Sequence, residues 1–120
     1  MNMRTSCALA LCALLYLSAP LHAFNTFFAD KMPISRMTSE DVDILLRVVN
    51  ETLDNAPDGT TRRWDNPSTG AGGLLTPQNS YKDRGEECRD LEVENHAGDM
   101  TNRMVIPACK QPDGTWKARP

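Results

Sequence analysis

Residues 86–116, EECRDLEVENHAGDMTNRMVIPACKQPDGTW, decide the fold of this chain. Within them, Gly98-Asp99 fits a two-residue hairpin loop, because the first central position needs a positive φ that glycine adopts without steric cost. Residues that face each other across this hairpin have numbers that sum to 197, and Cys88 and Cys109 satisfy that sum. They fall at a non-hydrogen-bonded pair, where side chains come closest, so the register predicts a Cys88–Cys109 disulfide.

The same loop assignment predicts further pairs between strands at about 87–95 and 101–110. Two apolar pairs lie on one face, and a third pair joins opposite charges: Leu91–Ile106, Val93–Met104 and Glu94–Arg103. A slip of one residue would lose all of these pairs, because successive side chains point to opposite faces of a sheet.

The end of the chain predicts a second hairpin. Pro112-Asp113-Gly114 is typical of a tight turn with a glycine bulge. This turn would pair Lys110 with Trp116 in a last short strand and place the indole at one end of the core.

Residues 37–59, MTSEDVDILLRVVNETLDNAPDG, carry a helix signal. Thr38 can cap the start, with Asp41 in the capping-box position three residues later. Apolar residues follow at helical spacing and form one stripe: Val42, Leu45, Leu46, Val49 and Leu53. We predict a helix at about 39–54 and interpret its stripe as core rather than as a ligand groove.

The remaining segments favour short antiparallel strands between turns. TTRRW predicts one strand, DNPSTGAGG a turn-rich link, LLTP the start of a second strand and KDRGE another turn. The predicted fold class is therefore α+β, with one N-terminal amphipathic helix packed on a four- to five-stranded antiparallel meander. We expect this single domain to span residues 38–120.

Residues 1–23 are typical of a secretory signal peptide, with Arg4, an apolar run and a break at Pro20 before Ala23. The run is shorter than the ~20 residues that span a bilayer. We expect cleavage after Ala23, which also removes Cys7 and Cys12. An irregular lead-in at 24–37 follows. Its phenylalanines either dock on the domain or mark a loosely held arm, and the sequence leaves both readings open: Phe24, Phe27 and Phe28.

Composition and motifs argue against catalysis and nucleic-acid binding. Without residues 1–23 the chain has 12 basic and 16 acidic residues, whereas nucleic-acid binding needs a basic face. His96 would be the one remaining histidine, and no serine lies in a nucleophile-elbow pattern. A metal site from His96, Asp99 and Glu94 lacks a second histidine or thiolate. We expect no catalytic residue, no cofactor, no metal and no small-molecule substrate.

Residues 53–118 resemble the C-terminal domain of the rickettsial seventeen-kilodalton surface-antigen family of bacterial envelope proteins. The resemblance rests on separated motifs that keep their order and spacing: Trp64, Asn66, Pro67, Gly70, Thr76, Pro77, Tyr81, Cys88, Arg89, Ala108, Cys109, Asp113, Gly114 and Trp116. Members of that family often carry a lipobox cysteine and a glycine zipper before this domain. We find neither here, since residues 24–38 contain no glycine.

The resemblance implies an exported protein of the periplasm or cell envelope, with an envelope protein or outer-membrane component as its partner. Two functions remain open. The first is a non-enzymatic structural or interaction module, and the alternative is a small periplasmic binding or inhibitor protein. An exposed cluster of Trp, Tyr and Phe would favour the alternative.

Overall fold

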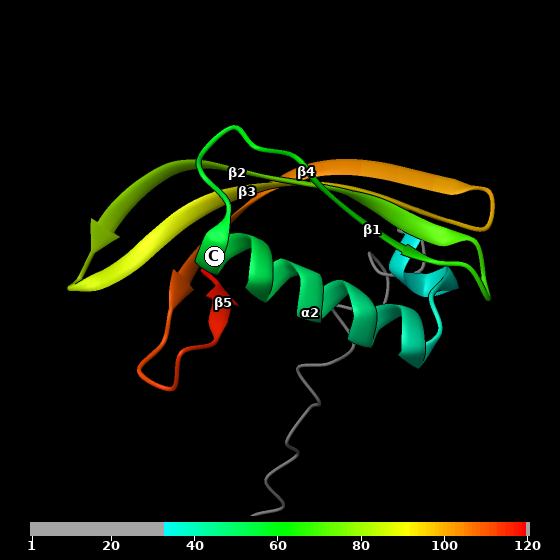
Figure 1. Cartoon of the computed structure of the whole chain (residues 1–120), viewed down its shortest axis with the longest axis horizontal. Helices are drawn as coiled ribbons and strands as arrows, with labels where there is room; N and C mark the ends of the chain where they lie inside the picture. Colours follow the sequence, from blue (N-terminus) through cyan, green and yellow to red (C-terminus); the bar gives the residue numbers. More distant parts are fainter. Residues whose placement is uncertain (1–32, 120) are drawn as a thin grey trace, which may run out of the picture.

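The computed structural model describes residues 33–119, which form one helix against a five-stranded antiparallel sheet (Figure 1). The elements in chain order are η1 (Pro33–Arg36), α2 (Ser39–Asn55), β1 (Arg62–Asn66), β2 (Ala71–Asp83), β3 (Glu86–Ala97), β4 (Met100–Lys110) and β5 (Trp116–Ala118). The strands pair in the order in which they occur along the chain. The predicted α+β meander is confirmed. The predicted signal peptide and residues 24–32 lie outside the described residues, whereas the end of the predicted irregular lead-in forms η1.

Helix α2 begins at the predicted capping box. The Thr38 hydroxyl accepts from the Asp41 backbone N–H at 3.1 Å, and the Asp41 carboxylate accepts from the Thr38 N–H at 2.8 Å. At the other end, Arg89 of β3 donates to the carbonyl of Leu53 at 2.8 Å. That carbonyl is one of the last four of the helix, which have no partner inside it. The capping box therefore satisfies backbone groups at the first end of the helix, and Arg89 satisfies one carbonyl at the other.

The β3–β4 hairpin has the register that the sequence predicts. Gly98 has a φ of 59°, and Cys88 faces Cys109 and forms the disulfide. Both apolar pairs are present, as is the Lys110–Trp116 pair of the next hairpin. The sheet is thus covalently tied across β3 and β4, near the end where β5 joins.

The predicted register places Glu94 opposite Arg103 correctly, but the expected ion pair between them is wrong. Arg103 faces Glu94 across the strands, but its guanidinium binds Glu92, one diagonal step away. Glu92 also accepts a hydrogen bond from Gln78 of β2 at 2.6 Å. A long arginine side chain reaches diagonal neighbours, and here it joins a polar network across three strands of the outer face.

The sequence predicted a turn-rich link at DNPSTGAGG and the start of the second strand at LLTP. In the structure β2 already begins at Ala71, so the last three residues of the predicted link belong to the strand. Gly73 pairs with Trp64, and a Cβ on Gly73 would lie 2.0 Å from the Glu94 carbonyl oxygen and 2.8 Å from the Trp64 indole nitrogen. Trp64 is buried and donates this N–H to Asn95 at 3.0 Å. The glycine is therefore needed because backbone and indole approach each other closely within the strand.

The core lies between α2 and the sheet. Its buried members come from the helix and from four strands: Leu45, Leu53, Trp64, Ala71, Leu75, Leu91, Val93, Ala97 and Ala108. Leu46 departs from the predicted stripe because its side chain is 53% exposed. The helix packs mainly on β1 and β2, so the side of α2 that carries Leu46 overhangs sheet surface that the helix does not cover.

We predict that Cys109→Ser lowers the free energy of unfolding by about 2–5 kcal/mol, the usual loss for a native bridge in a small domain. The bridge closes a loop with a sequence separation of 21 residues. Urea unfolding of the wild type and of Cys109→Ser, with Cys88 blocked in the variant, measures the loss. Equal stabilities would show that the bridge does not constrain the domain.

We also predict that Gly73→Ala destabilises the protein by about 1–3 kcal/mol, the usual cost of forcing atoms into a filled space. Gly70→Ala is the control, because a Cβ at Gly70 would meet nothing within 4 Å. At Gly70 the cost should come from its φ of 78° alone. Urea unfolding measures both losses. The indole emission of the folded protein, before urea is added, should differ from wild type for Gly73→Ala and not for Gly70→Ala, since only the first displaces Trp64.

Candidate binding groove

An apolar groove of about 280 Å³ lies between the overhanging side of α2 and the far half of the sheet. Helix α2 forms one side of it, strands β3, β4 and β5 form the other, and η1 contributes one residue. Its lining residues are Ile34, Leu45, Leu46, Val49, Leu53, Leu91, Val93, Asn95, Asn102, Met104, Ile106, Ala108, Trp116 and Ala118. We call it the α2–β4 groove.

The alternation of β4 explains the chemistry of the groove. Met104 and Ile106 point toward the helix side and are half-buried, whereas Val105 between them points to the opposite face and is 55% exposed. Ile34 of η1 lies at one end of the groove, and Trp116 of β5 lies at the other. The sequence did not predict this groove, because we interpreted every apolar residue of the helix stripe as part of the core.

One polar atom in the groove lacks a partner. The Oδ1 atom of Asn102 is buried and accepts no hydrogen bond from any described residue. Asn102 pairs with Asn95, whose own Oδ1 is taken by Trp64. An unsatisfied buried acceptor costs free energy, so this position favours a ligand that brings a donor.

The edge of β4 beside the groove is open over most of its length. Strand β5 pairs only with Ala108–Lys110, and the Arg119 N–H donates to the Pro107 carbonyl at 2.7 Å. No described strand lies beside residues 100–106. In the hairpin register the backbone groups that point outward there belong to alternate residues, which are Thr101, Arg103 and Val105. A free edge of this kind can accept an added strand.

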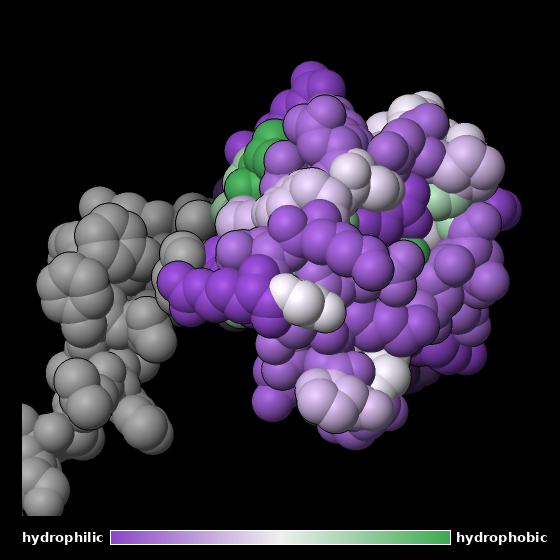
Figure 2. Space-filling model, turned by 90° about the vertical axis from the view of Figure 1, so that its left-hand side faces the viewer, coloured by the Kyte–Doolittle hydropathy of each residue, from purple (hydrophilic) through white to green (hydrophobic). Residues whose placement is uncertain are grey.

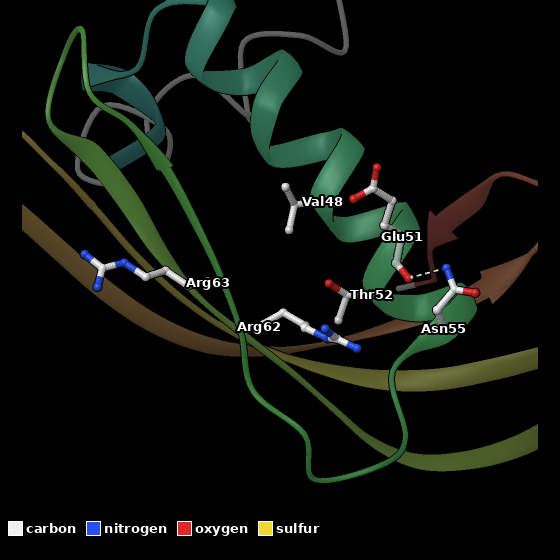
Figure 3. Close-up of a pocket in the computed structure, with 6 residues that line it drawn as sticks. All are labelled: Val48, Glu51, Thr52, Asn55, Arg62 and Arg63. Atoms are coloured by element: carbon white, nitrogen blue, oxygen red, sulfur yellow. Dashed lines mark hydrogen bonds between the residues drawn. The ribbon is translucent and has the colours of Figure 1, made fainter.

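A second, more polar pocket of about 380 Å³ lies between the end of α2 and β1 (Figure 3). Its lining residues are Val48, Glu51, Thr52, Asn55, Arg62 and Arg63. The Asn55 amide donates to the backbone carbonyl of Glu51 at 3.1 Å, and Arg63 points away from the other side chains (Figure 3). The Thr52 hydroxyl is buried without a described partner. With its carboxylate and its arginines spread apart, this pocket has no convergent polar set.

One group of potential metal-ligand atoms occurs among the described residues, and its chemistry does not suit a metal ion. The potential ligand atoms of Glu86, Cys88 and Cys109 lie within 4.8 Å of one another, but the two sulfurs are bonded to each other and are not thiolates. His96 lies on β3 with its Nε2 atom 3.1 Å from the Gly70 carbonyl oxygen. Asp99 and Glu94 do not join it in a cluster of ligand atoms in this part of the chain.

The face of the molecule that Figure 2 shows is mainly polar. From the end of the molecule at which β5 and the β2–β3 hairpin lie, hydrophilic residues predominate, and hydrophobic surface is confined to small separate areas (Figure 2). In the described residues no helix has the length and apolar character needed to cross a membrane.

Comparison with known proteins now adds to this geometry. Residues 51–117 match the family described as the 17 kDa outer membrane surface antigen. The chain belongs to this family.

Relatives in this surface-antigen family include rickettsial proteins named 17 kDa surface antigen. That of Rickettsia bellii is 32% identical over 82 residues, which cover 68% of this chain and 52% of the relative. That of Rickettsia prowazekii is 32% identical over 79 residues, covering 65% and 50%. The Rickettsia conorii protein is 30% identical over 82 residues, again covering 68% and 52%. The chain thus spans about half the length of these relatives, and no solved structure gives a significant match.

The residues on which the resemblance to the surface-antigen family was based lie mostly in turns and in the core rather than in the groove. Asn66, Pro67 and Gly70 form the β1–β2 turn, in which the Gly70 N–H donates to the Asn66 carbonyl at 2.8 Å. Asp113 and Gly114 form the last turn, where Asp113 accepts from the Thr115 N–H and hydroxyl. These positions therefore shape the fold.

The two aromatic residues of the late motifs differ in their surroundings. Trp116 is half-buried, and its indole N–H donates to Asp54 of α2 at 2.9 Å, which ties β5 to the helix. Tyr81 is 39% exposed on β2, with its hydroxyl 3.4 Å from Asp90. Of all the residues on which the resemblance rests, Ala108 and Trp116 also line the groove.

The first turn of α2 is joined to the β1–β2 turn by a buried polar cluster. The Asp41 carboxylate is fully buried and accepts from the Asn66 amide at 2.7 Å and from the Thr69 hydroxyl at 2.6 Å. Desolvation alone would raise the pKa of Asp41, but the hydrogen bonds from Thr69, Thr38 and Asn66 together outweigh it and lower that pKa. This cluster holds the helix over β1 and β2.

We predict that Asp41→Asn lowers the free energy of unfolding at pH 7 by about 1–3 kcal/mol, the usual cost of disrupting hydrogen bonds to a buried charged group. Because the folded pKa lies below the ordinary value of 3.8, the stabilisation by the carboxylate is present above about pH 4. It is lost as the pH falls through the folded pKa. Urea unfolding should therefore show a difference between wild type and variant that shrinks below pH 4. Asp43→Asn, at an exposed position of the same turn, is the control.

Proposed function

We propose that this chain is an exported, non-enzymatic protein of the bacterial envelope that acts as a structural or interaction module. Three observations support the proposal. The chain belongs to the surface-antigen family, residues 1–23 have the layout of a signal peptide, and Cys88 and Cys109 are joined in a disulfide rather than available as nucleophiles. Its proposed partner is an envelope protein or an outer-membrane component.

The α2–β4 groove is the observation that carries this proposal. It combines apolar side chains from η1, α2 and three strands with an open strand edge and one unpartnered acceptor. The disulfide and the capped helix hold both walls in place, so the surface is preformed. Preformed apolar grooves beside a free edge suit binding of an extended or amphipathic polypeptide segment.

The alternative, a small periplasmic binding or inhibitor protein, predicts an exposed aromatic cluster. Among the described residues Trp64 is buried, Trp116 is half-buried and Tyr81 lies alone on β2. The described surface therefore favours the first function over the alternative.

The test is a comparison of two leucine variants of the exported protein. Leu46→Lys places a charge in the groove, whereas Leu74→Lys places the same charge on β2, outside the lining of the groove. Both leucines are already exposed, at 53% and 40%. We predict that both variants fold and reach the same cell fraction as the wild type, and that only Leu46→Lys loses capture of an envelope component by at least tenfold.

Fractionation and mass spectrometry of the captured material read out this prediction. Equal capture by wild type, Leu46→Lys and Leu74→Lys would contradict a role for the groove. Recovery of the wild type in the cytosol with residues 1–23 still attached would contradict export.

A further inference from the structure

We propose that the α2–β4 groove and the open edge of β4 are the docking site of residues 24–32 of the same chain, FNTFFADKM. The inference deepens the proposed function by naming a competitor for the partner, carried within the chain itself. The test of this inference needs only purified protein, whereas the test of the proposed function needs an envelope component. Either one can therefore fail while the other succeeds.

The place where the described chain begins supports this occupant. Ile34 lines the groove, and the Ser35 hydroxyl lies 3.9 Å from the sulfur of Met100, the first residue of β4. Residue 32 immediately precedes Pro33 and lies two residues before Ile34 in the sequence, so the segment joins the described chain close to one end of the groove. No linker has to be crossed before the segment can reach its site.

Length and direction also agree. The open stretch of β4 covers residues 100–106, or about 23 Å at ~3.3 Å per strand residue. Residues 24–32 can span about 30 Å when extended, which is enough to follow that stretch. Strand β4 runs away from η1, so a segment that runs toward Pro33 along the same edge is antiparallel to β4. Strand β5 also pairs antiparallel with β4, farther along that edge.

The side chains of the segment match the chemistry of the groove. Three of its nine residues are phenylalanine, and Phe24 and Phe28 have the same parity. In a strand added to β4 both would therefore point to the same face of the sheet, and a register that turns this face toward α2 places them beside Met104 and Ile106. The backbone of such a strand would pair with the outward groups of β4.

The experiment is amide hydrogen exchange of the chain that starts at Phe24, followed residue by residue by NMR. Thr101, Arg103 and Val105 report on the open edge, because their N–H groups point outward. The test variant is Phe24→Ser with Phe28→Ser, and the matched control is Asn25→Ser with Ala29→Ser. None of the four positions belongs to the described domain, so its folding should be unaffected.

We predict that the three edge amides are protected in the wild type and in the control, and that they exchange at least tenfold faster in the test variant. Leu46→Lys, which alters the groove instead of the segment, should give the same acceleration. The amide of Leu91, which the pairing of β3 with β4 directs inside the sheet, should not respond to any variant.

Three outcomes would overturn the inference. Fast exchange of the edge amides in the wild type would show that nothing covers the edge in the isolated chain. Protection that falls about tenfold on tenfold dilution would assign the edge to a second copy. Protection that appears only when a captured envelope component is added would assign the site to that partner, which would support the proposed function and exclude docking in cis.

Discussion

The antiparallel pairing of β3 with β4 is the constraint on which the rest of this structure depends. The glycine turn at Gly98 sets which residues face each other, and the Cys88–Cys109 bridge makes that register covalent. Every other strand takes its place from this pair, with β2 on one side and β5 on the other. Because side chains alternate along strands, the register also decides that Met104 and Ile106 face the helix while Val105 faces away. The chemistry of the groove is thus a consequence of one hairpin.

The position of the helix follows from polar contacts at its two ends. Asp41 ties the first turn to the β1–β2 turn, and Arg89 ties the last turn to β3. Arg89 also binds Asp58 at 2.7 Å, which fixes the loop after the helix. Both ties draw α2 toward the first strands of the meander, and the sheet is wider than one helix. A strip of apolar surface on β4 therefore stays uncovered beside Leu46, and the groove results from this mismatch in width.

The sequence predicts those parts of the fold in which local chemistry specifies geometry. The capping box at Thr38, the turn at Gly98 and the cysteine pairing are of this kind, because each depends on residues that are close in sequence or joined by one turn. The start of β2 could not be predicted, since Gly73 is needed for a contact with Trp64 and Glu94 from two other strands. The partner of Arg103 depends likewise on its diagonal neighbours. The helix stripe showed which side chains are apolar, but the exposure of Leu46 depends on where the tertiary contacts place the helix.

The candidate site was the least predictable part, and its edge indicates why it matters for function. An exposed strand edge invites pairing with other chains, and proteins limit that risk with charge or by covering the edge. Here β5 covers the end of β4 at Ala108–Lys110, and Arg103 supplies a charge on the outer face. The remaining stretch combines an open backbone with the apolar side chains of Met104 and Ile106, which is the arrangement that most favours strand addition. A domain held by a disulfide and by two helix ties has little freedom to close that stretch by rearranging. An extended segment supplied from elsewhere, in cis or in trans, is therefore the simplest way to satisfy its backbone groups and cover its apolar side chains together.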